Sequence, residues 1–160
     1  MKVYHGTSFE TALKIAEDGA ILSPWEQKIL WLSTRPDRVE ALSRRDASES
    51  IEELALRLAS GEFMESELEH RAKSVSFAED LISAWACAVY FEKYNGGVVL
   101  GFQIDDSYED EHNFIYIPRK QGLESLDEII MLPVATRNHG AIKAAFSRYN
   151  VKYTHDYELK

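Results

Sequence analysis

The sequence predicts an α+β domain, and three observations predict it. Short apolar runs typical of strands lie toward both ends of the chain, over 2–8, 98–105 and 126–132, whereas the middle, 46–95, has helical apolar spacing. Strands and helices therefore do not alternate regularly. With 160 residues, 45% of them hydrophobic and 28% charged, the chain is long enough for one packed core. We expect a single domain over residues 1–160.

The first predicted element is a strand over 2–8, which leads into a helix over 9–16. Ser8 stands where a side-chain oxygen can accept from the free N–H groups of the first helical turn. Gly19 tolerates the left-handed conformation that ends many helices. The order strand, cap, helix and glycine stop is therefore predicted for the first twenty residues or so.

A candidate ligand site lies in this strand at His5, Gly6 and Thr7. An imidazole offers a directed hydrogen bond, and a glycine without a side chain lets backbone amides approach a ligand. Thr7 adds a hydroxyl next to them. The same residues are also consistent with a hairpin-like turn that carries an exposed histidine.

A second strand is predicted over Ile29–Ser33, because this run is short, apolar and bounded by polar residues. The preceding segment, 20–28, is expected to be a loop or a short edge segment, since Pro24 interrupts a continuous helix. Trp31 is consistent either with core packing or with a flat surface for a ligand ring. A helix over 36–45 is expected to follow, because proline is favoured at the first helical position.

The segment 46–95 is predicted to be an inserted helical segment. Apolar residues have helical spacing over 51–59, and a long helix is expected to start at Ser76 with Glu79 in a capping-box position. Its role is open between target selection, a lid and a plain surface cover. The spacing of its possible metal ligands favours a solvated face, so no metal is predicted. These side chains are Glu65, Glu67, Glu69 and His70.

In the C-terminal part of the chain the sequence predicts four strands and one helix. The strand over 98–105 is apolar at nearly every position, which is typical of a central strand. The remaining elements are strands over 113–117, 126–132 and 150–156 and a helix over 141–147.

Charge and composition limit the classes of partner. The formal net charge of −9 would repel a long polyanion, so binding of nucleic acid would need a local basic face. A diphosphate is a smaller target that a cluster of arginines could bind, although a solvated helical face is the commoner meaning of such arginines. The cluster consists of Arg35, Arg38, Arg44 and Arg45.

Several common kinds of site are excluded by the sequence. The single cysteine, Cys87, allows neither an intramolecular disulfide nor a cysteine-based zinc site. No apolar run approaches the length of a membrane span, and no signal peptide is evident, so we expect a cytoplasmic protein without membrane contact. A Walker loop, a dinucleotide-binding glycine fingerprint, a hydrolase nucleophile elbow and a zinc-protease motif are absent.

The run Tyr4-His5-Gly6-Thr7, the following helix, Gly19 and the run Ile29–Thr34 together resemble a known family. They are similar to the amino-terminal half of ADP-ribosyltransferases of the diphtheria toxin and poly(ADP-ribose) polymerase type. The resemblance implies a split β-sheet core with an inserted helical segment over 46–95. It also implies NAD as the substrate and a His-Tyr-Glu triad, with Trp31 at the tyrosine position.

The resemblance assigns roles residue by residue. His5 would bind the adenosine ribose, the Gly6 backbone would hold the nicotinamide amide, and Trp31 would stack on the nicotinamide ring. Glu128, an acid at the start of a late strand, would stabilise the positive charge that develops on the ribose, so that His5 and Glu128 are the catalytic residues. The remaining cofactor-binding positions would be Thr7, Ser33, Arg35 and Arg38.

Some of these assignments have alternatives. A register shifted by one residue would put Leu32 in place of Trp31, and Asp127 or Glu124 could be the true counterpart of the catalytic glutamate. Relatives that modify arginine carry Glu or Gln two residues before the catalytic glutamate. Leu126 stands there, which disfavours arginine as the acceptor.

The function that the resemblance implies is NAD-dependent mono-ADP-ribosyl transfer to a macromolecule, with a protein acceptor favoured over nucleic acid because the chain is acidic. Two alternatives stay open. One is a related enzyme, an NAD glycohydrolase or an RNA 2′-phosphotransferase. The other is an inactive module that binds ADP-ribose or a protein partner. The biological use, whether as a toxin, a phage countermeasure or a regulator, and the oligomeric state are not predicted.

Overall fold

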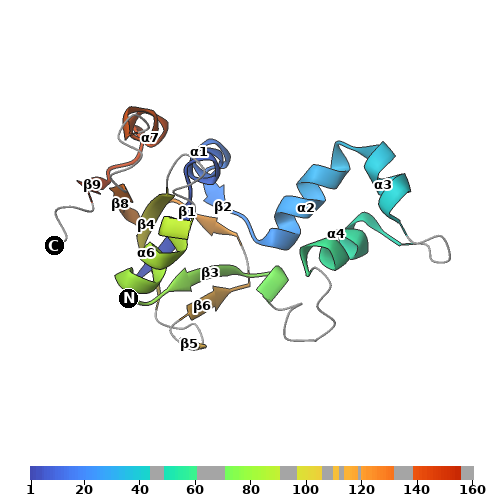
Figure 1. Cartoon of the computed structure of the whole chain (residues 1–160), viewed down its shortest axis with the longest axis horizontal. Helices are drawn as coiled ribbons and strands as arrows, with labels where there is room; N and C mark the ends of the chain where they lie inside the picture. Colours follow the sequence, from blue (N-terminus) through green and yellow to red (C-terminus); the bar gives the residue numbers. More distant parts are fainter. Residues whose placement is uncertain are drawn as a thin grey trace. The chain divides into compact units, whose positions relative to one another are not determined.

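A computed structural model describes residues 1–43, 49–60, 71–90, 97–105, 110–111, 114–118, 120–131 and 139–155. The chain divides into two compact units. Figure 1 shows the chain with colours that follow the sequence from the N-terminus in blue to the C-terminus in red. The first unit comprises Met1–Ile21, Ser76–Tyr116 and Gly122–Lys160. The second comprises Leu22–Val75 and Ile117–Gln121. Both helices and strands are present, so the α+β class is confirmed.

The described residues form a seven-stranded sheet in the order β5-β6-β3-β1-β4-β8-β9. Strand β1 pairs antiparallel with both β3 and β4, and at the other end β8 pairs parallel with β9. The bounds are β1 (Lys2–Ser8), β3 (Val75–Ala78), β4 (Gly97–Gln103), β5 (Asp110–Glu111), β6 (Phe114–Ile117), β8 (Leu126–Met131) and β9 (Lys152–His155). A two-stranded sheet pairs β2 (Ala20–Ile21) with β7 (Gln121–Gly122).

Helix boundaries follow local capping chemistry. Ser8, Ser23 and Ser50 each accept a hydrogen bond from the backbone N–H three residues later, which satisfies a donor of the first turn. At the other end of the first helix Gly19 adopts φ 71°, the left-handed region that glycine enters without a steric penalty. The described helices are α1 (Phe9–Asp18), α2 (Pro24–Ser33), α3 (Pro36–Leu42), α4 (Ile51–Ala59), α6 (Leu81–Tyr90) and α7 (His139–Ala145).

The register of β1, β4 and β8 defines the two faces of the first unit's sheet. Tyr4 is opposite Gly101, which is opposite Glu128, and the next row is His5, Leu100 and Ile129. Because side chains alternate along a strand, these two rows point to opposite faces. We call them the Tyr4 face and the His5 face.

Helix α6 covers the Tyr4 face. A Cβ built at Gly6 or Gly97 would collide with the carbonyl oxygen of Ala84 or Ala88, so both glycines let this helix lie directly on the sheet. Buried Ala84 and Ala88 pack there together with Val99 and Ile130 of the strands. Cys87 lies on the same helix and is exposed. Small residues on both sides of this contact therefore set how closely the helix approaches.

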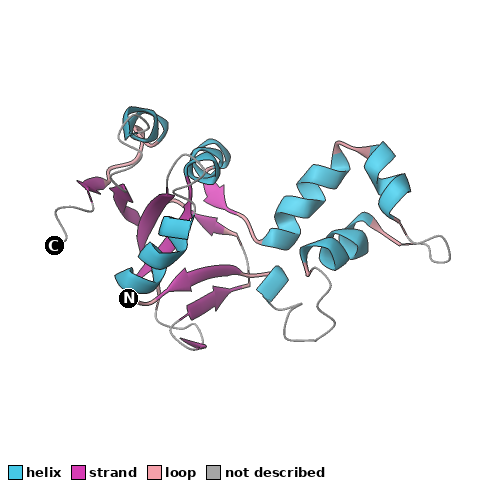
Figure 2. Ribbon diagram, viewed as in Figure 1, coloured by secondary structure: helices cyan, strands magenta, loops and turns pink. Residues whose placement is uncertain are grey.

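The second unit contains a helical core. Helices α2, α3 and α4 pack on one another, and Figure 2 shows them as a group of helices. Leu32, Leu54 and Ala55 are buried at the centre. The guanidinium of Arg57 makes two hydrogen bonds to the carboxylate of Glu49, at 3.1 and 2.8 Å, and fixes the chain just before α4.

Two predicted elements are wrong. Residues Ile29–Ser33 belong to helix α2 and not to a strand, because Pro24 occupies the first helical turn behind the Ser23 cap and starts the helix instead of interrupting it. The helix expected from Ser76 begins only at Leu81, and Val75–Ala78 forms β3. The segment 46–95 is therefore not purely helical.

The other predicted elements that fall in the described residues are confirmed. These are the strands near 2–8, 98–105, 113–117, 126–132 and 150–156 and the helices near 9–16, 36–45, 51–59 and 141–147, with ends that shift by a few residues. Arg44 and Arg45 lie outside the described residues. So do the possible metal ligands Glu65, Glu67, Glu69 and His70.

Candidate functional site

His5 is held in place by the neighbouring strand β3. Its ring atom Nδ1 lies 2.9 Å from the carbonyl oxygen of Ser76. A carbonyl oxygen only accepts, so Nδ1 carries the proton and donates, which fixes the tautomer of the neutral ring. The ring also meets Phe77 edge to face, with centroids 5.8 Å apart.

The side chain of His5 contacts strand β3 close to the point where β1 and β3 pair. The registered pairing of β1 with β3 is at Tyr4 and Ala78, one residue before His5. The hydrogen bond to the Ser76 carbonyl comes from the imidazole side chain and not from the backbone of His5. The histidine is tied to the sheet by Nδ1, and its orientation depends on β3.

The environment of His5 favours the neutral imidazole. Burial lowers the pKa of His5 below its ordinary value of 6.5, and the hydrogen bond to Ser76 offsets part of this shift. No charged side chain contributes to the shift. The other ring nitrogen, Nε2, then carries a lone pair and has no hydrogen-bond partner in the described part of the chain. His5 is half-buried, and Nε2 can accept a hydrogen bond from a ligand hydroxyl.

Gly6 and Thr7 point to opposite faces. The missing side chain of Gly6 makes room for α6, so helix packing explains this glycine without any ligand. Thr7 is on the His5 face, since it is two residues further along the strand. The whole residue is only 5% exposed, and within the described residues its hydroxyl has no hydrogen-bond partner.

The structure does not bring Glu128 beside His5. Glu128 is in the Tyr4 row, two strands away from β1, and its side chain is on the face opposite to the imidazole. There its carboxylate accepts a hydrogen bond from the Thr154 hydroxyl at 3.1 Å and lies 3.4 Å from Lys2 Nζ. Gly101 between them leaves room for the lysine side chain to reach across. The catalytic role of Glu128 stays a prediction from the resemblance alone.

The alternative acids are also placed apart from His5. Asp127 lies at the irregularity where β4 and β8 change register, and it contacts Lys2 and Gln103, the latter at 3.2 Å. Glu124 is exposed in the turn before β8. Neither shares the row of His5.

The remaining predicted contacts belong to the second unit. Trp31 lies on helix α2, half-buried against the Leu32 cluster, with Lys28 and Arg35 cations 5.4 and 5.1 Å from its ring centre. Arg35 donates to the Trp31 carbonyl at 3.0 Å, and Ser33 donates to the Leu30 carbonyl at 2.9 Å. Arg38 is exposed. Trp31 therefore lies on a helix and not on the predicted strand, and its packing against the Leu32 cluster accounts for this residue.

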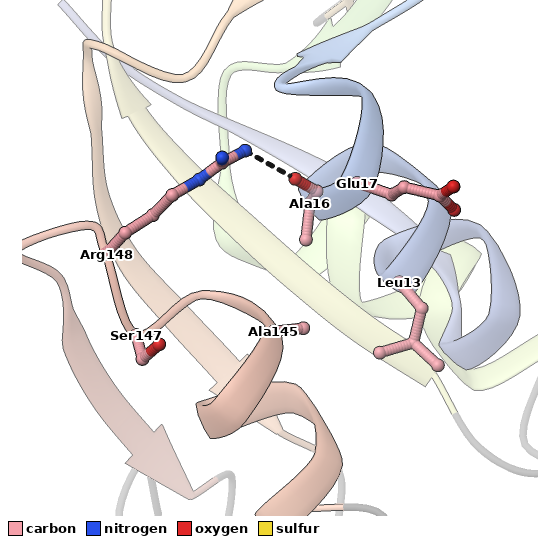
Figure 3. Close-up of a pocket in the computed structure, with 6 residues that line it drawn as sticks. All are labelled: Leu13, Ala16, Glu17, Ala145, Ser147 and Arg148. Atoms are coloured by element: carbon pink, nitrogen blue, oxygen red, sulfur yellow. Dashed lines mark hydrogen bonds between the residues drawn. The ribbon is translucent and has the colours of Figure 1, made fainter.

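An open pocket of about 320 Å³ lies elsewhere in the first unit, and Figure 3 shows its lining. One side is the end of α1 and the other is the turn after α7. Arg148 donates to the Ala16 carbonyl at 2.9 Å, which satisfies an acceptor that the helix end leaves open. The lining residues are Leu13, Ala16, Glu17, Ala145, Ser147 and Arg148, none of them predicted from the sequence as a site residue.

Sequence reasoning missed Ser76 and Phe77. Both lie in β3, in a segment where the sequence analysis predicts the start of a helix. A signal existed, because the segment has β-branched and aromatic residues at alternate positions, and Asp80 just after it accepts from the Ser83 N–H at 2.8 Å as a cap for α6.

The described residues contain neither a metal-binding cluster nor a membrane-spanning helix. Among the described residues no group of His, Cys, Asp and Glu side chains is arranged to hold a metal ion. In the same part of the chain no helix has the length and apolar character needed to span a bilayer.

No protein-family model and no curated protein sequence matches the chain. A solved structure, Thermosipho africanus DarTG in complex with ADP-ribose, is similar with a TM-score of 0.50 and 11% sequence identity. The likeness covers 97% of this chain and 50% of that chain, so the protein spans half the length of its structural neighbour. At this identity the likeness concerns the fold.

Proposed function

We propose that the protein binds NAD and transfers its ADP-ribose unit to a macromolecular acceptor, as a mono-ADP-ribosyltransferase. The observation that carries the proposal is the oriented, neutral His5 on β1, whose Nε2 is left to accept from a ribose hydroxyl. The similar fold of a protein that was solved with ADP-ribose supports the choice of ligand.

In the proposed reaction the bond between the nicotinamide nitrogen and ribose C1′ breaks, and nicotinamide leaves with the bonding electrons. A nucleophile of the acceptor then forms the new bond to C1′ and gives up its proton. The chain has to hold the ribose at His5 and to stabilise the positive charge that develops on the sugar.

The carboxylate that stabilises this charge has to lie on the His5 face of the sheet, where the ribose would be bound. Glu128 is predicted for this role by resemblance, but it is on the opposite face and is already paired with Lys2 and Thr154. The Glu128→Gln variant described below tests whether Glu128 supplies this carboxylate.

A second candidate function is a module that binds ADP-ribose without catalysis. The engagement of Glu128 by Lys2 and Thr154 favours it, because a carboxylate tied in this way is not available to a ribose on the other face. An NAD glycohydrolase differs from the transferase only in using water as the acceptor.

The test is nicotinamide release from NAD by the purified protein, with and without a cell extract as a source of acceptors. We expect release by the natural protein, at least a tenfold loss in His5→Ala, and little change in Glu128→Gln. Binding of ADP-ribose without any release would favour the binding module, and transfer of labelled ADP-ribose would separate the transferase from the glycohydrolase.

A further inference from the structure

The pocket at the end of α1 is separate from the candidate ligand site around His5. Strand β1 ends at Ser8, and α1 then runs for ten residues, which is about 15 Å of helix. The pocket lies at the far end of this helix, where its second half faces the end of α7 and the turn that follows. Its lining includes neither His5 nor any residue predicted to bind NAD.

The volume and the apolar lining indicate the size of ligand that the pocket can hold. Its volume of about 320 Å³ is at the lower end of the range of roughly 300 to 1,000 Å³ that small-molecule pockets occupy. It is about twice the cavity of roughly 150 Å³ that holds benzene in an engineered protein. Leu13, Ala16 and Ala145 supply apolar surface. A single ring or a short branched chain therefore fits.

Arg148 gives the pocket a positively charged wall. Its guanidinium donates to the Ala16 carbonyl at 2.9 Å and lies 5.0 Å from the ring centre of Tyr149, and these contacts hold the group in place. The hydrogen bond uses one of the five N–H donors of the guanidinium. A guanidinium that is held in position and keeps spare donors is suited to bind a carboxylate through paired hydrogen bonds.

The other charged group of the lining does not neutralise this arginine. Figure 3 shows the Glu17 side chain pointing away from Arg148. Among the described residues no carboxylate forms an ion pair with Arg148. The hydroxyl of Ser147, also in the lining, is a further donor next to the arginine in the chain. The polar side of the pocket is therefore rich in donors and carries a positive charge.

We propose that this pocket binds a small carboxylate with an apolar body, a single ring or a short branched chain. The carboxylate accepts from the guanidinium of Arg148 and from the hydroxyl of Ser147, while the body packs on the apolar side chains. Glu17 has the same sign as this ligand, so it opposes binding from the far side of the lining. The site is additional to the one at His5 and does not depend on the proposed function.

The experiment is titration of the isotope-labelled full chain with benzoate, followed through the amide chemical shifts. We expect saturable shifts centred on the second half of α1 and on residues 145–149. Benzamide, which has the same size without the charge, should cause no comparable response. Absence of shifts with benzoate, or equal responses to benzoate and benzamide, would overturn the proposal.

Two substitutions test the sign of the ligand charge. Arg148→Gln keeps an N–H donor for the Ala16 carbonyl and removes the positive charge, so we expect benzoate binding to weaken about tenfold. Glu17→Gln removes a charge of the same sign as the ligand, so it should leave the affinity unchanged or raise it by less than about threefold. A loss of affinity in Glu17→Gln as large as that in Arg148→Gln would refute recognition of an anion.

A matched pair of substitutions on α7 tests the place of binding. Ala145→Leu extends a side chain of the lining into the pocket, whereas its neighbour Ala144 is exposed and is not part of the lining, so Ala144→Leu is the control. We expect at least a tenfold loss of benzoate affinity in Ala145→Leu and no change in Ala144→Leu. Leu13→Phe fills the same space from α1 and carries the test if the spectrum shows that Ala145→Leu is unfolded. Natural affinity in a folded filling variant would show that benzoate binds elsewhere.

Discussion

At the scale of single residues, His5 connects the fold to the proposed chemistry. The donor and acceptor roles of its ring follow from one contact, the hydrogen bond from Nδ1 to the Ser76 carbonyl. The same partly buried position lowers the pKa of the ring. Burial of the ring therefore favours its neutral form, while the hydrogen bond to β3 orients it and offsets part of the pKa shift.

The lowered pKa of His5 predicts how binding depends on pH. Protonation converts Nε2 from an acceptor to a donor, so binding through a ribose hydroxyl weakens in the charged form. Because the folded pKa is below 6.5, we expect ADP-ribose affinity to be constant from pH 8 down to about 6.5 and to fall only below it. The measurement is titration at a series of pH values. Affinity that already falls between pH 8 and 7 would contradict a lowered pKa.

The same shift affects stability with a defined sign. The folded state resists protonation of His5 more than the unfolded chain does, so this contribution to stability is complete above pH 6.5 and is lost as the pH falls through the window below that value. Denaturant unfolding should show this acid-side slope in the natural protein and a smaller slope in His5→Gln. Equal slopes in both would assign the acid sensitivity to other groups.

Glu128→Gln tests the structural role of the carboxylate on the Tyr4 face. The side chain is 18% exposed and has two partners, so we expect the substitution to reduce the free energy of unfolding by roughly 1 to 2 kcal/mol. Urea denaturation measures the change. No loss of stability together with loss of nicotinamide release would instead support the catalytic role that the resemblance implies.

At the scale of elements, the contact of α6 with the sheet depends on glycine. A methyl group at Gly6 would meet the backbone of Ala84, which cannot move aside without shifting the helix. We expect Gly6→Ala to cost roughly 1 to 3 kcal/mol, as overpacking does elsewhere. Gly140→Ala is the matched control, because nothing lies within 4 Å of the added atom. Melting temperatures of the two variants should differ clearly, and equal values would refute the tight contact.

The elements also show what the sequence could predict. Strand β1, its Ser8 cap and the Gly19 stop were predictable because each depends on residues within one turn of the boundary. Helix α2 was not, since Ile29–Ser33 is apolar enough for a strand, and the Ser23 cap and Pro24 that start the helix lie several residues earlier. Strand β3 was not predicted either, because the sequence analysis starts a helix at Ser76, and the site residues Ser76 and Phe77 lie in this strand.

The opposite orientation of Glu128 and His5 was beyond sequence reasoning for a different reason. Which face a strand residue occupies depends on pairing between segments far apart in the chain. Here Glu128 is paired with Gly101, next to an irregularity in the register of β4 and β8, and this pairing decides its face. A shift of one residue exchanges the two faces, so no local pattern could decide it.

At the scale of the whole molecule, the two compact units have separate cores. Leu54 is fully buried in the second unit, and its replacement by alanine should cost roughly 2 to 5 kcal/mol. We expect amide exchange in Leu54→Ala to speed up in α2, α3 and α4 and to remain slow in β1 and β4. Faster exchange throughout both units to the same extent would mean that they unfold as one.

The exposed thiol on α6 offers a practical way to follow the contact of this helix with the sheet. Cys87 is the only cysteine of the chain, and it is next to Ala88, which contacts the backbone at Gly6 and Gly97. An environment-sensitive fluorophore attached there would be a single, homogeneous reporter without any engineered residue. Its emission would register movement of the helix against the sheet while nucleotides are screened.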